Sequence, residues 1–224
     1  MLTPPSPSDE IPKRLDKATI NELPLVHFHG SIQVADDSES FERLCALLVN
    51  EKVLGFDIEC KPNFKRGPNN PPALIQLATA DQAFLFTLHP VMKKLGPLVK
   101  ILEDPSIIKT GVALKDDLIN LQKIEPFKPD GFQDLASIAQ SLKIEQTGLR
   151  NLTAIFFNQR LSKSAQLSNW QKRPLSPAQI NYAATDAWIS RELYQTMKPK
   201  DAAKIFEELE MDVLLQVVEK MIMS

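Results

Sequence analysis

Two acidic residues, Asp57 and Glu59, stand one residue apart at the end of an apolar run that begins at Val53. In an extended strand, side chains two residues apart project from the same face, so the two carboxylates point the same way. Two like charges at the end of an apolar strand are costly unless a cation neutralises them. Because carboxylate oxygens suit Mg²⁺ or Mn²⁺, and no cluster of His and Cys indicates zinc, the pair indicates a divalent metal site. A solvated strand end is the alternative.

A further acidic position lies in the segment 111–118, where a strand is expected to lead into a helix. The buried stripe of that helix is expected to contain Leu114, Leu118 and Leu121. Asp117 flanks this stripe on the side nearest the carboxyl edge of the sheet, so we predict that Asp117 rather than Asp116 faces the site. The alternative is that both acids simply favour the first turn of a helix.

Tyr182 and Asp186 are four residues apart in a predicted helix, whose start is marked by the cap residue Ser176 and the first-turn proline Pro177. Residues at this spacing share one face of a helix. A carboxylate there can hold a metal ion while a phenol one turn away holds an attacking water. The small residues between them would let the helix approach a sheet closely. The alternative is a tyrosine hydroxyl that merely bridges to a nearby helical acid.

The elements that must position these residues follow from the periodicity of the apolar positions. Strand-like and helix-like patterns alternate, which predicts an α/β fold with a mostly helical second half. A helix follows Ser38, its predicted cap. Short extended runs are expected at residues 26–28 and 32–34, strands at 53–58, 73–78, 83–86, 107–111 and 131–133, and helices at 91–102, 114–122, 135–142, 149–157, 177–197 and 202–223.

A single domain is expected for a chain of 224 residues, of which 43% are hydrophobic. Residues 1–24 are rich in Pro, Ser and charge and are predicted to be a mobile arm. Residues 25–198 are predicted to form the domain, and residues 199–224 an amphipathic helix packed on it, with self-association through this helix as the alternative. Cys45 and Cys60 form neither a disulfide framework nor a metal-binding spacing. With no run of about 20 apolar residues, the sequence predicts a soluble, intracellular protein outside the membrane.

The formal net charge of −2 argues against a partner rich in phosphate, because proteins that bind phosphates are often basic. Metal binding by the four carboxylates would reverse the sign of this balance, and a local basic rim would then be enough. Candidate residues for that rim are Lys61, Lys65, Arg66, Lys163, Lys172 and Arg173. Trp170 is a candidate for stacking on a base. A solvated surface charge, or an interior tryptophan, is the alternative for each of them.

Taken together, these patterns resemble the three motifs of the DEDD exonuclease superfamily, in its tyrosine-bearing branch. The motifs are Phe56-Asp57-Ile58-Glu59 on a strand, Asp117 one turn into a helix, and Tyr182 followed four residues later by Asp186. The resemblance covers residues 27–198 and looks closest to the exonuclease domain of the Werner syndrome protein and the catalytic domain of ribonuclease D. Further similarity lies at residues 73–77, 111–112, 167–170 and 182–187. Cys60 departs from the pattern, since Werner-type domains carry a tryptophan there.

The resemblance implies a ribonuclease H-like fold, with a mixed five-stranded sheet flanked by helices. It also implies a 3′–5′ exonuclease that hydrolyses DNA or RNA from a free 3′ end to nucleoside 5′-monophosphates. By the same resemblance, two divalent metal ions, Mg²⁺ or Mn²⁺, are held by Asp57, Glu59, Asp117 and Asp186, and Tyr182 orients the nucleophilic water. The motifs do not distinguish DNA from RNA.

Two alternatives to this function stay open at the level of sequence. A nuclease-fold module that docks nucleic acid or a helicase would share the fold, although such a module would be expected to have lost at least one carboxylate. A glycosidase could use Asp57 and Glu59, but it would not explain Tyr182 and Asp186 at one helical turn. A homo-oligomer or a helicase partner is a further hypothesis.

Overall fold

The computed structural model describes residue 2 and residues 11–63, 70–88 and 95–198 of the chain. A six-stranded mixed sheet forms its centre, in the order β1-β4-β3-β2-β5-β6. Its strands are β1 (Ser31–Ala35), β2 (Val53–Cys60), β3 (Pro72–Ala78), β4 (Gln82–Thr87), β5 (Ile108–Gly111) and β6 (Phe132–Asp134). Strand β3 is antiparallel to its neighbours β2 and β4, whereas the other neighbouring strands are parallel.

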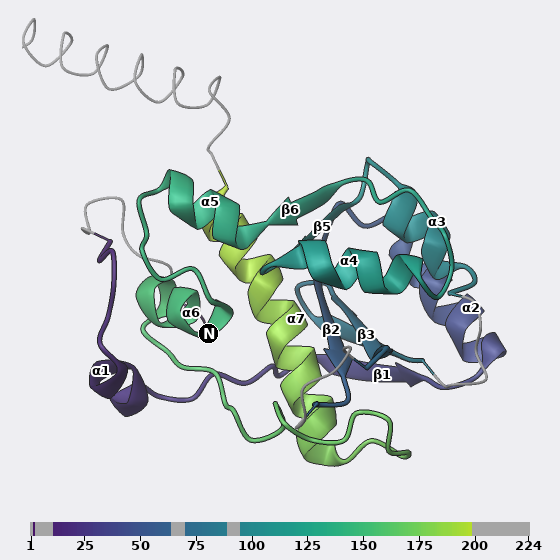
Figure 1. The fold of residues 1–224 in the computed structure, drawn as a ribbon, viewed down its shortest axis with the longest axis horizontal. Helices are drawn as coiled ribbons and strands as arrows, with labels where there is room; N and C mark the ends of the chain where they lie inside the picture. Colours follow the sequence, from purple (N-terminus) through teal and green to yellow (C-terminus); the bar gives the residue numbers. More distant parts are fainter. Residues whose placement is uncertain (1, 3–10, 64–69, 89–94, 199–224) are drawn as a thin grey trace, which may run out of the picture.

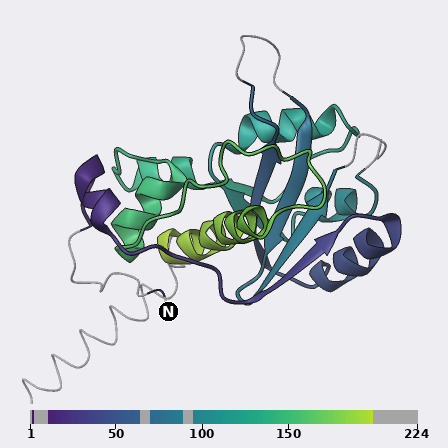
Figure 2. The same ribbon diagram turned by 90° about the horizontal axis from the view of Figure 1, so that it is seen from below.

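Helices cover both faces of this sheet (Figure 1, Figure 2). Helices α2 (Ser38–Leu48), α3 (Leu98–Glu103) and α4 (Leu114–Gln122) pack on one face, and the long helix α7 (Pro177–Met197) crosses the other. Helices α5 (Leu135–Ser141) and α6 (Leu149–Phe157) pack against α7 in a second apolar cluster. Within the described ranges, no helix is both long and apolar enough to cross a lipid bilayer.

The alternation of side chains along β2 decides which of them reach α7. The core beneath α2, α3 and α4 receives Leu54, Phe56 and Ile58. Because neighbouring residues of a strand point to opposite faces, Gly55, Asp57 and Glu59 lie on the α7 side. The two carboxylates predicted to point the same way therefore do so, and they face the helix that carries Tyr182 and Asp186.

Helix α7 approaches the sheet closely because the residues at the contact are small. A Cβ atom at position 55 would lie 1.7 Å from the Ala187 carbonyl oxygen, so only glycine fits there. Ala183, Ala184 and Ala187 are fully buried in this contact. The close approach predicted from the small residues of this helix is confirmed, and it brings the α7 side chains within reach of the end of β2.

Most predicted elements are confirmed. The helices at residues 114–122, 149–157 and 177–197 have the predicted bounds. The sheet has six strands rather than five, because β1 pairs in parallel with β4 and extends that edge. Ser38 is not the cap of α2. The Asp37 side chain accepts the capping hydrogen bond from Ser40 N at 2.7 Å. The helix predicted within residues 199–224 lies outside the described residues.

The N-terminal segment differs from the predicted mobile arm. Its described part contains helix α1 (Lys17–Glu22), in which Ile20 is buried. Leu15 N donates a hydrogen bond to Gln146 Oε1 at 2.9 Å, which fastens the segment to the loop before α6. The prediction of a free arm is therefore corrected for residues 11–24. A few apolar and hydrogen-bonding contacts anchor this segment, although its overall composition is polar.

Candidate active site

Three carboxylates meet where the end of β2 faces the middle of α7. The carboxylate oxygens that Asp57, Glu59 and Asp186 offer lie within 4.8 Å of one another. Asp186 is buried, and the other two are partly buried. They line a cleft of about 460 Å³ together with Tyr182. Two motifs that are more than a hundred residues apart in the chain are thus combined in one site.

No ion pair within the described residues balances the charge of this cluster. Among the described residues, the ion pairs are Arg14 with Glu145 and Arg191 with Glu192, and neither touches the cluster. Burial, followed by repulsion from neighbouring carboxylates, raises the pKa of Glu59 to about 10 and that of Asp57 well above its ordinary value. Burial also raises the pKa of Asp186 to about 7. An oxygen-only donor set that lacks a counter-charge fits divalent cations such as Mg²⁺ or Mn²⁺.

Asp117 reaches the cluster from helix α4. Its negative charge raises the pKa values of Asp57 and Glu59, so it lies close enough to act on both. Burial, with repulsion from Asp116 and Asp134, raises the pKa of Asp117 itself to about 7. Asp116 is exposed. The structure therefore brings Asp117 rather than Asp116 to the site, although Asp117 lies outside the tight group of three.

The start of α4, which sets the position of Asp117, is fixed by a neighbouring strand. Ala113 has left-handed backbone angles (φ 58°) and offers no side-chain cap. The Asp134 carboxylate at the end of β6 accepts hydrogen bonds from Ala113 N at 3.2 Å and Leu114 N at 3.1 Å. It also accepts from Ala136 N at 2.8 Å and so caps α5. One half-buried carboxylate at the end of the edge strand thus anchors two helices.

Tyr182 is held on two sides. Its hydroxyl is hydrogen-bonded to Asp186, and its ring lies against the Trp170 indole at 5.9 Å between centroids, tilted by 47°. Burial, followed by repulsion from Asp186 and Glu59, raises the pKa of Tyr182, so the phenol stays protonated. The helix that carries it begins as predicted, since the Ser176 side chain accepts from Gln179 N at 3.3 Å.

Two of the predicted nucleic-acid contacts are corrected. Trp170 is fully buried, so it supports Tyr182 and offers no face to a base. Arg173 donates to the Trp170 carbonyl at 2.7 Å and to the Ala73 carbonyl at 2.8 Å, which fastens the 162–175 loop to β3. Its Nη1 and Nη2 atoms are therefore engaged by backbone carbonyls, whereas its buried Nε has no hydrogen-bond partner among the described residues. The prediction that these residues contact nucleic acid depended on their charge or aromatic ring in a loop, and neither property indicates whether a side chain is buried.

The remaining predicted cations divide between the cleft and the surface. Lys163 lines the cleft. Lys172 and Lys61 are exposed, and neither belongs to the residues that line it. Lys65 and Arg66 lie outside the described residues. Of the predicted rim residues that the structure describes, Lys163 is the one that lines the cleft with the carboxylates.

Two further residues near the site were not predicted. Arg150, in the first turn of α6, lines the cleft. Gln76 of β3 is paired across the sheet with Asp57, is fully buried, and has no hydrogen-bond partner for its amide among the described residues. The sequence did offer a signal for Gln76, because a glutamine inside an otherwise apolar strand indicates a polar group near a site. Nothing in the local sequence indicates where Arg150 lies.

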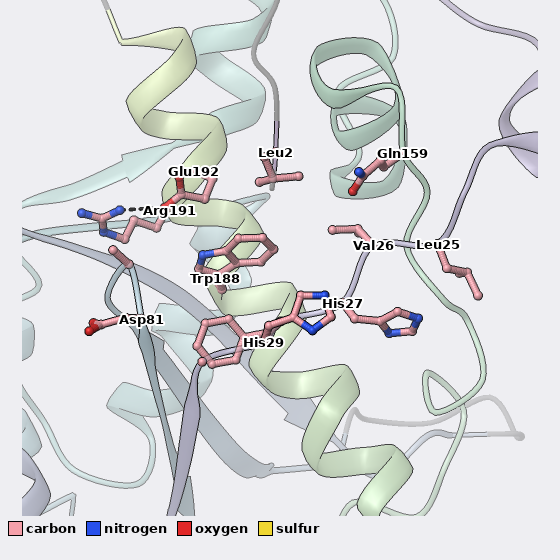
Figure 3. A pocket seen from close by; sticks show the side chains of 13 residues that line it. Leu2, Leu25, Val26, His27, His29, Asp81, Gln159, Trp188, Arg191 and Glu192 are labelled. Atoms are coloured by element: carbon pink, nitrogen blue, oxygen red, sulfur yellow. Dashed lines mark hydrogen bonds and ion pairs between the residues drawn. The ribbon is translucent and has the colours of Figure 1, made fainter.

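A second cavity, of about 540 Å³, lies along α7 away from the carboxylates (Figure 3). Trp188, His27 and His29 contribute to its wall, and Leu2 reaches it from the N-terminus. A smaller hollow of about 180 Å³ lies next to both cavities, since it shares His27 with this one and Tyr182 with the cleft.

The fold and the acidic cleft together define a class of nucleases. The structure of the exonuclease domain of Nibbler from Aedes aegypti superimposes with a TM-score of 0.65 at 25% sequence identity, covering 83% of this chain and 89% of that one. Both chains therefore share the exonuclease fold, in which a mixed sheet is crossed by a long helix.

Residues 32–201 match the sequence family described as 3′-5′ exonuclease, and the chain belongs to this family of hydrolytic nucleases. It is 32% identical over 196 residues to the bifunctional 3′-5′ exonuclease/ATP-dependent helicase WRN of Mus musculus, covering 83% of this chain and 14% of that protein. It is 31% identical over 167 residues to ribonuclease D of Granulibacter bethesdensis, covering 73% of this chain and 41% of that protein. The chain thus spans less than half the length of either relative.

Proposed function

We propose that this protein removes nucleotides one at a time from the 3′ end of a nucleic acid and releases nucleoside 5′-monophosphates. The observation that supports the proposal is the convergence of carboxylates from β2 and α7 on one cleft beside Tyr182, with Asp117 of α4 close enough to raise the pKa values of Asp57 and Glu59. Their charge has no cationic partner among the described residues. Such an arrangement costs stability and is therefore expected only where a cation takes part in function.

In this proposal, Asp57, Glu59, Asp117 and Asp186 hold two divalent ions, Mg²⁺ or Mn²⁺. When bound, these ions supply Lewis acidity to a phosphodiester and lower the pKa of the attacking water. The carboxylates come from three elements that the core fixes in place, so the donor atoms are positioned before substrate arrives. The protein then needs no nucleotide cofactor.

Tyr182 orients the water rather than deprotonating it. Its raised pKa keeps the phenol protonated, so the hydroxyl, which donates its proton to Asp186, can accept a hydrogen bond from the water and cannot act as a base near neutral pH. The Trp170 ring and Asp186 fix its direction. The water oxygen forms a new bond to phosphorus while the bond to the 3′ oxygen of the preceding nucleotide breaks. The terminal nucleotide leaves with its 5′-phosphate, and the shortened chain keeps a 3′-hydroxyl.

The relatives direct the choice of substrates to test. One is called an exonuclease and helicase and another ribonuclease D, so DNA and RNA both belong in the assay. Gel-resolved digestion of 3′- and 5′-labelled single and double strands, with Mg²⁺, Mn²⁺ or EDTA, is the direct test. A metal-dependent ladder that shortens from the 3′ end, lost in Asp57→Ala and slowed in Tyr182→Phe, would support the proposal. Binding of nucleic acid without cleavage under any condition would instead indicate a docking module.

A further inference from the structure

Arg150 is a cation placed beside the carboxylate cluster without pairing to it. It lines the same cleft as Asp57, Glu59 and Asp186. No ion pair joins it to a carboxylate within the described residues. An arginine free to neutralise such a cluster would be expected to do so, because the pair would relieve an uncompensated charge. Something therefore holds Arg150 away from the carboxylates.

The residue that holds Arg150 comes from the N-terminal segment. Arg150 Nη2 donates a hydrogen bond to Asn21 Oδ1 of α1 at 2.7 Å. Helix α1 lies beside α6 in both ribbon views (Figure 1, Figure 2). The amide oxygen of asparagine is a neutral acceptor, so it fixes the direction of the guanidinium and leaves its charge uncancelled. The segment expected to be a free arm thus takes part in shaping the cleft.

Asn21 satisfies only part of the Arg150 guanidinium. Its Nε is buried and makes no hydrogen bond within the described part of the chain. A buried donor of a charged group that makes no hydrogen bond costs stability. If Arg150 served only to connect α1 to α6, this donor would be expected to have a hydrogen-bond partner. An oxyanion in the cleft would compensate the charge that Asn21 leaves uncancelled, since guanidinium binds phosphate oxygens through a planar fork.

The N-terminal end of helix α6 adds to the positive electrostatic potential in the cleft. Gly148, Leu149 and Arg150 line the cleft, and no side chain caps the first turn of this helix. The positive end of the helix dipole therefore points toward the same space. Lys163 also lines the cleft and supplies a second positive charge there. The helix end and Lys163 add to the positive charge of Arg150.

We propose that Arg150, set in place by Asn21, binds a backbone phosphate of the nucleic acid that enters the cleft. The inference rests on the proposed function for the identity of the ligand. It makes the N-terminal segment part of the substrate-binding apparatus. A phosphate bound there would lie in the same cleft that Asp57, Glu59 and Asp186 line.

The test measures binding apart from catalysis. A fluorescent single-stranded oligonucleotide is titrated, by anisotropy, into an Asp57→Asn parent and into that parent with Arg150→Gln, Arg150→Lys, Asn21→Ala or Arg14→Gln. We expect Arg150→Gln to weaken binding about ten-fold and to lower the slope of log affinity against log salt by about 0.7, the value of one phosphate contact on a single strand. Arg150→Lys should restore part of the loss, and Asn21→Ala should lie between the parent and Arg150→Gln.

Arg14 provides the matched control, because it is an exposed arginine of the same segment that pairs with Glu145 at 3.9 Å and does not line the cleft. Arg14→Gln removes the same charge and should leave affinity within two-fold. Scanning one neutral methylphosphonate through the linkages near the 3′ end should find a linkage that weakens the parent but not Arg150→Gln.

Two results would overturn the inference in distinguishable ways. Unchanged affinity and salt slope in Arg150→Gln, with a lowered melting temperature, would show that Arg150 only ties α1 to α6 and would leave the proposed function intact. Failure of the parent to bind any oligonucleotide, with or without metal, would contradict the proposed function and this inference together.

Discussion

Two cavities beside α7 differ in how their charged groups are balanced. In the acidic cleft, three carboxylates stand together with no cationic partner in the described structure. In the cavity beside Trp188, Arg191 pairs with Glu192 at 2.7 Å and also donates to the Val53 carbonyl at 3.3 Å. The second cavity is the larger, at about 540 Å³ against 460 Å³. Uncompensated charge, rather than size, therefore marks the cleft as the site of chemistry.

The difference also shows what holds each cavity open. The cavity beside Trp188 is bounded by ring packing, with Phe28 and Trp188 5.6 Å apart, and this packing contributes to stability. The acidic cleft is maintained against electrostatic repulsion by the rigid sheet and helix that carry its carboxylates. Substitutions in the acidic cleft should therefore relieve a cost in stability, whereas substitutions in the cavity beside Trp188 should lower stability.

The largest effect on the rate of digestion is expected at Asp117, and the adjacent Asp116 provides its control. Asp117→Asn should lower the rate of 3′-end removal about 10³-fold, because in the proposed function it removes a ligand of the divalent cations. Asp116→Asn removes the same charge one residue away on the exposed side of α4 and should leave the rate within about three-fold. Single-turnover rates at saturating Mn²⁺ make the comparison. Equal losses in the two variants would mean that Asp117 acts only through general electrostatics.

A smaller loss is expected at the tyrosine. Tyr182→Phe keeps the ring against Trp170 and removes only the hydroxyl, so the rate should fall about 10²-fold while substrate affinity stays within about three-fold. The rate and the affinity are measured separately, by single-turnover digestion and by anisotropy. A loss confined to affinity would show that Tyr182 binds the strand rather than orienting the water.

The metal-free protein should lose stability as pH rises. Burial raises the folded-state pKa of Asp117 and Asp186 to about 7 and that of Glu59 to about 10, whereas their unfolded values lie near 4. Between those limits the folded state binds more protons than the unfolded state, so the free energy of unfolding falls with rising pH. In EDTA, we expect the melting temperature to fall by roughly 3–10 °C from pH 5 to pH 8. A melting temperature that rises over this interval would contradict the uncompensated charge.

The smallest effect on activity is expected from the larger cavity. Trp188→Leu should destabilise the fold by about 1–3 kcal/mol through lost packing and should leave the rate of digestion unchanged below the melting transition. Thermal melts and digestion of the same preparations give both numbers. A ten-fold loss of activity without loss of stability would instead show that this cavity contributes to substrate binding or turnover.

The parts of the site that depend on local periodicity could be predicted from the sequence. Asp57 and Glu59 share a face because a strand alternates, and Tyr182 and Asp186 share one because they lie one helical turn apart. The choice of Asp117 over its neighbour needed only the apolar stripe of α4. Each of these three inferences depends on a pattern contained within about ten consecutive residues.

The parts that depend on tertiary contacts could not be predicted in this way. The burial of Trp170 arises from β3 and α7 packing around a loop whose composition is polar. The direction of the Arg150 guanidinium depends on its contact with Asn21 of α1, which lies 129 residues away in the chain. The position of β1 at the sheet edge likewise depends on its pairing with β4, for which a five-residue strand carries little signal.

The most direct test of the central claim is the melting temperature of wild-type and Asp57→Asn protein at pH 8, each in EDTA and in Mn²⁺. If the cluster is uncompensated charge built for divalent cations, Asp57→Asn should melt higher than wild type in EDTA, and Mn²⁺ should raise the wild type far more than the variant. If Asp57→Asn melts lower in EDTA and Mn²⁺ shifts the two proteins equally, the carboxylates are structural and the proposed metal site is contradicted.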